Sequence, residues 1–334
     1  MSVLLRFYVR RFLRIFPLYY FVLGLAIAAN YREARELAQW LLTYTSNIYM
    51  TTHGEWLGGF SHFWTLAVEE QFYLVWPLLL LFLPKKHLIP ALVLVMGAGP
   101  LYRAYAVTHH VHELGARYFT VACFDVLGMG ALLAVMPRTA LSKTRVGKLG
   151  VRLMLPVGIV ATILLCNLRA HQPMSSAYVV FIDLALALVC CRFVSAASRG
   201  LTGIAGAVLA SRPLRYIGKI SYGLYVYHYF MPTLFSPWIR QLGLGRTGTV
   251  LLQGVVCLLA SLVVAALSWS LLESPLNSFK RYFAYEGEGA EQRDSYRRLQ
   301  TVRNRLSDVV GAKDDTETSP LPSSARETTS TGKQ

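Results

Sequence analysis

Long apolar runs recur along the 334-residue chain, separated by short polar or basic connections. A helix of roughly 20 apolar residues is long enough to cross the hydrocarbon core of a bilayer. The runs that approach or exceed this length lie near residues 13–29, 63–83, 88–106, 119–136, 153–169, 176–195, 217–236 and 249–272. They are continuously apolar and lack the alternation of barrel strands. The pattern therefore predicts an all-α, polytopic transmembrane bundle of about eight spans.

Composition supports the same fold class. Hydrophobic residues make up 54% of the chain and charged residues 15%, and the mean hydropathy is +0.42. A large soluble helical protein is the alternative, but soluble cores seldom need so many helices that are apolar all round. The five cysteines fall within or beside predicted spans without metal-ligand spacing, so no metal site is predicted.

The basic residues between the spans predict the orientation of the bundle. Sixteen Lys and Arg residues fall on one side of the predicted membrane and seven on the other, so the first side is cytoplasmic. With about eight spans, both termini are then cytoplasmic. This basic face suits anionic lipid headgroups or an anionic cofactor. It accounts for most of the formal charge of +15 without a nucleic-acid partner.

The chain divides into two parts by composition. Residues 1–283 form the predicted transmembrane domain, and residues 284–334 form a basic and then polar cytoplasmic tail that is predicted to be largely disordered. The longest outer connection contains residues 37–49, which are predicted to form an interfacial or re-entrant helix.

Several ionisable residues lie within predicted spans, where a charge is costly and often functional. Glu69 and Glu70 are about 100° apart on their helix, so only one of them faces the bundle interior fully. His228 shares a helix face with Ser221 and Tyr225, and a neutral imidazole there can accept a proton from an alcohol. The structural alternatives are a carboxylate paired with an Arg and a histidine bonded to a neighbouring helix.

Two further carboxylates, Asp125 and Asp183, also lie within spans. Asp125 is predicted to pair with Arg117 near the outer side, and Asp183 has no predicted partner. At the cytoplasmic entrance, Arg11 and Arg14 are three residues apart and so share one helix face. Two guanidinium forks on one face are suited to a phosphorylated ligand.

Four stretches carry a family resemblance, with a weaker match over residues 117–130. They are Arg11-Phe-Leu-Arg-Ile-Phe-Pro-Leu-Tyr-Tyr20, Phe63-Trp-Thr-Leu-Ala-Val-Glu-Glu-Gln-Phe-Tyr-Leu-Val-Trp-Pro77, Ile220-Ser-Tyr-Gly-Leu-Tyr-Val-Tyr-His228 and Glu273-Ser-Pro275. In these residues the chain resembles the membrane-bound acyltransferase family 3, which includes O-acetyltransferases of O-antigen and other surface polysaccharides. The resemblance extends over roughly residues 6 to 283.

The resemblance implies a multi-pass enzyme of the bacterial inner membrane. It would move an acyl group, with acetyl as the family default, from cytoplasmic acyl-CoA to a hydroxyl of a sugar, polysaccharide or lipid-linked acceptor at the outer face. Arg11 and Arg14 would then hold the phosphates of CoA, and His228 and Glu69 would be the catalytic residues. The substrate chamber would be lined by Trp64, Glu70, Tyr73, Ser221, Tyr222 and Tyr225.

One departure from the family pattern lies at the start of the chain. Family members usually begin with two further spans, the first bearing an Arg and then a His that is thought to be the catalytic base, whereas this sequence starts just before the Arg-rich entrance. Three explanations stay open: a longer protein, a family member without acyl transfer, or a substitute base such as His228 or Glu69. Outside this enzyme class, a proton-coupled transporter and a non-catalytic membrane subunit are the alternatives.

Overall fold

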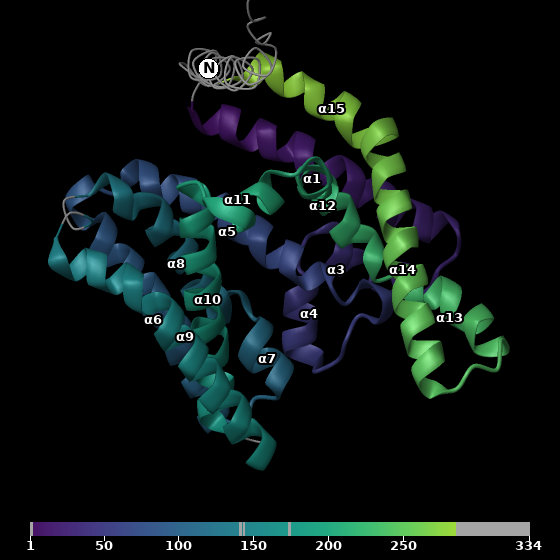
Figure 1. Ribbon diagram of the computed structural model, residues 1–334, viewed down its shortest axis with the longest axis horizontal. Helices are drawn as coiled ribbons and strands as arrows, with labels where there is room; N and C mark the ends of the chain where they lie inside the picture. Colours follow the sequence, from purple (N-terminus) through teal and green to yellow (C-terminus); the bar gives the residue numbers. More distant parts are fainter. Residues whose placement is uncertain (1–2, 140–141, 143, 173–174, 285–334) are drawn as a thin grey trace, which may run out of the picture.

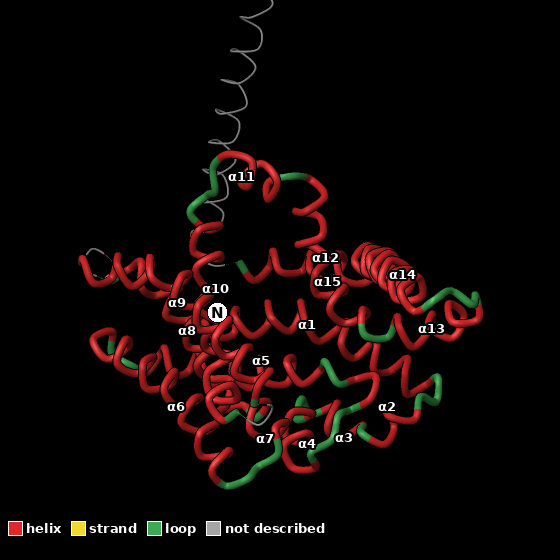
Figure 2. Tube along the Cα trace, turned by 60° about the horizontal axis from the view of Figure 1, so that its bottom comes forward, coloured by secondary structure: helices red, strands yellow, loops and turns green. Residues whose placement is uncertain are grey.

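The computed structural model describes residues 3–139, 142, 144–172 and 175–284, and all regular secondary structure in these residues is helical (Figures 1 and 2). The prediction of an all-α fold is confirmed. The predicted tail lies outside the described residues, except for Ala284.

The described helices differ widely in length. The long ones are α1 (Val3–Ala28), α5 (Phe63–Phe82), α6 (Leu88–Thr108), α9 (Arg145–His171), α10 (Ser176–Ser198) and α14 (Arg246–Ser268). The shorter α-helices are α2 (Arg32–Glu36), α3 (Ala38–Leu42), α4 (Ser46–His53), α7 (Glu113–Tyr118), α8 (Phe124–Val135), α11 (Gly203–Ala210), α12 (Arg212–His228), α13 (Met231–Gln241) and α15 (Ser274–Ser278). Single turns include η3 (Thr120–Cys123), the π-helical η6 (Trp269–Glu273) and η7 (Phe279–Phe283).

Within the described part of the chain, six helical segments are long and apolar enough to cross a membrane. They are Val3–Ala28, Phe63–Phe82, Leu88–Thr108, Gly147–His171, Ser176–Ser198 and Arg246–Phe283. Large apolar side chains such as Leu164 and Leu251 are exposed on these helices, which is the surface that a lipid environment favours. The protein is therefore an integral, multi-pass membrane protein.

The other two predicted spans are not single long helices in the structure. The run at 119–136 becomes η3 and α8, an apolar unit of Thr120–Val135 that is shorter than the six long helices. The run at 217–236 is not continuous, because α12 ends at His228 and α13 begins at Met231. Pro232 lies in the first turn of α13, where the backbone N–H that proline lacks would have no helical partner. In the interior of a continuous helix, the same proline would remove a backbone hydrogen bond.

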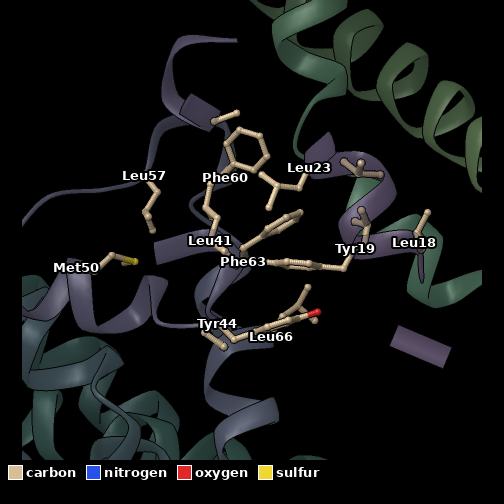
Figure 3. Packing of buried hydrophobic residues seen from close by; sticks show 14 residues of the cluster. Leu18, Tyr19, Leu23, Leu41, Tyr44, Met50, Leu57, Phe60, Phe63 and Leu66 are labelled. Carbon is tan, nitrogen blue, oxygen red and sulfur yellow. Dashed lines mark hydrogen bonds between the residues drawn. The ribbon is translucent and has the colours of Figure 1, made fainter. Parts of the chain in front are cut away.

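The segment predicted to be interfacial or re-entrant folds into the protein as α3 and the start of α4. Leu41 is completely buried and Tyr44 is 6% exposed. Tyr44 stacks on Tyr19 of α1 at 4.3 Å between ring centroids, and Tyr19 packs on Phe63 of α5 at 4.8 Å. Figure 3 shows these three rings together in the core that joins α1, α5 and the outer segment.

The two described ends of the chain meet. Arg10 on α1 donates a hydrogen bond from Nη1 to the Phe283 carbonyl in η7 at 3.4 Å. Figure 1 shows the start of α1 and α15 at the same end of the molecule. Both ends of the bundle therefore lie on one side, as the distribution of basic residues predicts.

Helix α5 lies between two groups of helices. Figures 1 and 2 show α6, α8, α9 and α10 on one side of it and α12, α13 and α14 on the other. Different faces of α5 therefore contact the two groups of helices.

Candidate active site

A cavity of about 720 Å³ opens between α1, α5, α12 and η7 and is called the arginine pocket below. Its volume is in the usual range for a small-molecule site. Its lining comprises Phe7, Arg10, Arg11, Arg14, Ile15, Thr65, Leu66, Glu69, Tyr73, Ser221, Tyr222, Tyr225 and Lys280. Seven of the ten residues proposed from the sequence are thus brought together: Arg11, Arg14, Glu69, Tyr73, Ser221, Tyr222 and Tyr225.

The lining of the arginine pocket is strongly basic. Three arginines and Lys280 contribute positive charge, and Glu69 is the acidic residue among the lining residues. The guanidinium carbon of Arg11 lies 3.2 Å from the ring centroid of Tyr73 and 5.0 Å from that of Phe7, so two aromatic faces fix the orientation of this fork. A pocket with this charge balance is suited to a ligand that carries several negative charges.

The two adjacent glutamates point into different cavities. Glu69 lines the arginine pocket and accepts a hydrogen bond at 3.4 Å from the Tyr73 hydroxyl. Glu70 lines a neighbouring cavity of about 530 Å³ with Tyr20 and Tyr44, and its Oε1 has no hydrogen-bond partner among the described residues. The rotation of about 100° per residue separates them, so Glu69 is the glutamate that faces the basic site.

Helix α12 forms the opposite wall and is tied to α1 and α5 by tyrosine hydroxyls. The Tyr222 hydroxyl donates to the Ile15 carbonyl at 2.8 Å, and the Tyr225 hydroxyl donates to the His62 carbonyl at 2.5 Å. Thr65 of α5 also hydrogen-bonds to the Tyr225 hydroxyl. These bonds hold Ser221 and Tyr225 toward α5 across the pocket.

His228 lies outside the arginine pocket. It is exposed at the last residue of α12 and lines a depression of about 490 Å³ with Ser221 and Tyr225, which are shared with the arginine pocket. Its Nδ1–H donates to the Tyr225 carbonyl at 2.6 Å, which leaves Nε2 as the proton-accepting atom. The expected common face of Ser221, Tyr225 and His228 is present, but His228 ends its helix and does not lie within a continuous span.

His62, which the sequence reading missed, lies just before α5 and packs beside His228 at 5.3 Å between ring centroids. Its Nε2–H donates to the Val226 carbonyl at 3.1 Å, and its buried Nδ1 has no hydrogen-bond partner within the described residues. The pKa of His62 is lowered to about 4, mainly by burial; the bond to Val226 opposes this shift and the neighbouring His228 adds to it. His62 is therefore a neutral imidazole that caps the end of α12.

The carboxylates of α8 and α10 pair differently from the prediction. Asp125 pairs with Arg103, whose Nη1 also donates to the Ala122 carbonyl at 2.9 Å, and Arg117 pairs with Asp183 at 2.7 Å. The predicted pairing of Asp125 with Arg117 is wrong. Arg103 lies near the end of the predicted span 88–106 and is fully buried in α6, which packs along α8. Gly99 permits this approach, because a Cβ there would lie 3.0 Å from the Asp125 backbone nitrogen.

The remaining predicted chamber residue, Trp64, lies on the other side of α5. Its ring packs against Tyr118 at 4.5 Å between centroids and lines a cavity beside α10. Phe7, Arg10, Thr65 and Lys280 line the arginine pocket without having been proposed from the sequence. Of these, Lys280 could have been predicted from the sequence. With an even number of spans, a basic residue just after the last span lies on the same side of the membrane as the start of α1.

The fold and the pocket define a class of protein: a multi-pass helical membrane protein with a basic pocket at the end of the bundle where the described chain ends meet. Comparison with protein families gives the particular family, since the acyltransferase domain matches residues 2–270 of the chain. The chain therefore belongs to the acyltransferase domain family, and the resemblance seen in its motifs is confirmed.

Curated relatives agree with this assignment. The chain is 27% identical over 303 residues to peptidoglycan O-acetyltransferase OatA of Listeria monocytogenes, a match that covers 83% of this chain and 47% of the relative. It is 25% identical over 294 residues to O-acetyltransferase OatA of Staphylococcus aureus, over 82% of this chain and 47% of the relative. The chain thus spans about half the length of these relatives. No solved structure matches it.

Proposed function

We propose that this protein is a membrane O-acyltransferase that moves an acyl group from cytoplasmic acyl-CoA to a hydroxyl of a glycan at the outer face. The observation that carries the proposal is the arginine pocket, where four basic side chains, at the end of the bundle where the described chain ends meet, line the same cavity as a carboxylate of α5. The family membership and the names of the relatives support the reaction class, and their acetyl transfer supports acetyl-CoA as the donor.

The basic lining is suited to the phosphates of the donor. Guanidinium groups bind phosphate through two parallel hydrogen bonds, and Arg11 and Arg14 are one helical turn apart on the same side of α1. Arg11 is already oriented by Tyr73, so less side-chain freedom is lost when it binds. The thioester would then extend past Ser221 toward Glu69, away from the cytoplasmic opening.

Glu69 is the proton acceptor that the geometry favours. It lines both the arginine pocket and the cavity on the other side of α5, whereas His228 reaches the pocket only through Ser221 and Tyr225. In the transfer step the acceptor oxygen attacks the thioester carbonyl carbon and its proton passes to the Glu69 carboxylate. The carbon–sulfur bond then breaks, CoA leaves as the thiolate and takes up a proton, and the acyl group remains on the acceptor as an ester.

Donor binding is tested with purified protein in lipid nanodiscs by titration with acetyl-CoA. Losing a hydrogen bond to a charged partner costs about 1.5–3 kcal/mol, so Arg14→Ala should raise the Kd for acetyl-CoA roughly 10- to 150-fold. The matched control is Arg32→Ala, which removes an exposed arginine from the outer helix α2 and should leave the Kd unchanged. Equal affinities in the two variants would contradict the proposed donor site.

Transfer is tested by release of the CoA thiol in the presence of soluble peptidoglycan fragments. Glu69→Gln should keep acetyl-CoA binding and lower the transfer rate by at least about 100-fold, as expected for the loss of a general base. His228→Gln should affect the rate less than Glu69→Gln; the reverse order would assign the base to His228. Accumulation of a solute in proteoliposomes without consumption of acetyl-CoA would instead favour a transporter.

A further inference from the structure

A cavity of about 470 Å³ lies between α5, α7, α8 and α10, and is called the aromatic cavity below. It meets the arginine pocket at two residues of α5, Thr65 and Glu69, which line both spaces. The helices around it are those on the far side of α5 from α12 in Figure 1. A ligand in the aromatic cavity can therefore reach the same carboxylate as a ligand in the arginine pocket.

Aromatic rings connect this cavity with the outer surface. Trp64 in the cavity packs against Tyr118 at 4.5 Å between centroids, and Tyr118 packs against Trp56 at 5.5 Å. Trp56 is 53% exposed. Since α5 starts at Phe63 on the outer side, Trp64 lies at the outer end of the helix and Glu69 lies deeper. The three rings thus form a continuous apolar surface from the outer connection toward Glu69.

Polar groups of α6, α7 and α10 form part of the cavity wall. Arg117 and Asp183 form an ion pair at 2.7 Å with partly exposed side chains, so both can bond to a ligand as well as to each other. Arg103 is fully buried at this wall, and its Nε has no hydrogen-bond partner within the described part of the chain. A buried donor without a partner is costly.

The charge balance distinguishes this cavity from the arginine pocket. Its lining has two arginines, Arg103 and Arg117, and two carboxylates, Asp183 and Glu69, so the formal charges cancel. The rest of the lining is largely apolar and includes Val68, Leu127 and Leu186. An uncharged ligand with many hydroxyls and apolar ring faces fits both conditions.

We propose that the aromatic cavity is the acceptor subsite and binds a sugar residue of a glycan that enters from the outer side. One face of the sugar ring lies on Trp64 and Tyr118, and its hydroxyls bond to Arg117 and Asp183. The hydroxyl to be acylated points to Glu69, where the two cavities meet. This inference deepens the proposed function and rests on it, since it makes Glu69 the point at which donor and acceptor come together.

The test measures binding of glycan and of donor separately on the full chain in nanodiscs. The glycan probes are chitotetraose and the disaccharide of N-acetylglucosamine and N-acetylmuramic acid, titrated by calorimetry, and the donor probe is acetyl-CoA. Trp64→Ala and Tyr118→Ala should each weaken binding of the glycan by at least about tenfold, because truncating an aromatic anchor of a binding site removes much of its affinity. Both variants should leave the Kd for acetyl-CoA unchanged, which also shows that they are folded.

The matched control is Trp238→Ala, which removes an exposed tryptophan from α13 on the opposite side of α5 and should leave glycan binding unchanged. Trp64→Phe should keep most of the affinity, since an aromatic face remains. The inference is overturned if wild-type protein binds neither glycan, or if Trp64→Ala weakens glycan and acetyl-CoA binding equally. Failure of wild-type protein to bind acetyl-CoA would instead overturn the proposed function, whatever the glycan result.

Discussion

Replacing Asp125 with Ala is expected to destabilise the protein strongly. The side chains of Arg103 and Asp125 are 1% and 0% exposed, so the variant leaves a guanidinium buried without its main partner. Breaking a buried pair in this way costs about 3–5 kcal/mol. Arg103 keeps a contact with Asp183 at 3.4 Å, which places the expected loss near the lower limit, about 3 kcal/mol.

The measurement is the free energy of unfolding in mixed detergent micelles with increasing fractions of dodecyl sulfate. Glu36→Ala is the matched control, because it also removes a carboxylate from an arginine, but Arg32 and Glu36 are 82% and 57% exposed. An exposed pair one turn apart contributes only about 0.3–0.5 kcal/mol. The two variants should therefore differ by more than 2 kcal/mol.

A double-mutant cycle shows which arginine is the partner of Asp125. The cycle of Asp125→Ala with Arg103→Ala should give a large coupling energy, since the two side chains are in contact. The cycle of Asp125→Ala with Arg117→Ala should give a small one, because Arg117 bonds to Asp183 instead. Stronger coupling with Arg117, or a loss below about 1 kcal/mol in Asp125→Ala, would refute the reasoning.

Two further outcomes follow from described contacts. Because burial lowers the pKa of His62 to about 4 from 6.5, the unfolded chain binds more protons between these values, and the free energy of unfolding should rise with pH by about 3 kcal/mol across this range. His62→Gln should flatten the pH dependence of the melting temperature in detergent, and an unchanged profile would rule out this assignment. Gly99→Ala places a Cβ 3.0 Å from the Asp125 backbone and should cost about 1–3 kcal/mol. Gly97→Ala on the same helix meets nothing within 4 Å and should be neutral or stabilising by up to about 1 kcal/mol, so equal losses in the same unfolding assay would show that close packing at Gly99 is not the cause.

The sequence predicts the helices best where apolar residues alone determine them. The runs at 63–83, 88–106 and 176–195 correspond to α5, α6 and α10, because apolar residues dominate each run almost from end to end. The predicted bounds are less accurate where part of a helix carries charged residues that line a pocket. Helix α1 begins at Val3, well before the apolar run at 13–29, since its arginines line a pocket.

The candidate site was predictable as a set of residue types but not as an arrangement. Helical spacing correctly places Arg11 with Arg14, and Ser221 with Tyr225, on common faces. Spacing within one helix does not reveal which neighbour each face meets. The separation of Glu69 from Glu70 therefore needed the positions of α1 and α12.

The partners of buried charges were the least predictable part. Arg103 looks like a residue near the outer end of a span, and nothing in its neighbourhood along the chain shows that α8 and α10 both turn a carboxylate toward it. Such pairing depends on contacts between helices distant in sequence, and no local pattern encodes them.

The ion pairs between α6, α7, α8 and α10 have a consequence for how the protein is made. Synthesis delivers these helices to the membrane in order, and a single charge near the middle of a span costs about 2.5–3.5 kcal/mol on insertion. Asp125 follows its partner Arg103 by only 22 residues in the sequence, whereas Asp183 follows Arg117 by 66 residues. We therefore expect α8 to enter the bilayer together with α6 as a charge-neutral pair, and α10 to pack against them afterwards. Loss of Asp125 should accordingly reduce the amount of protein that reaches the membrane, in addition to weakening the protein that does.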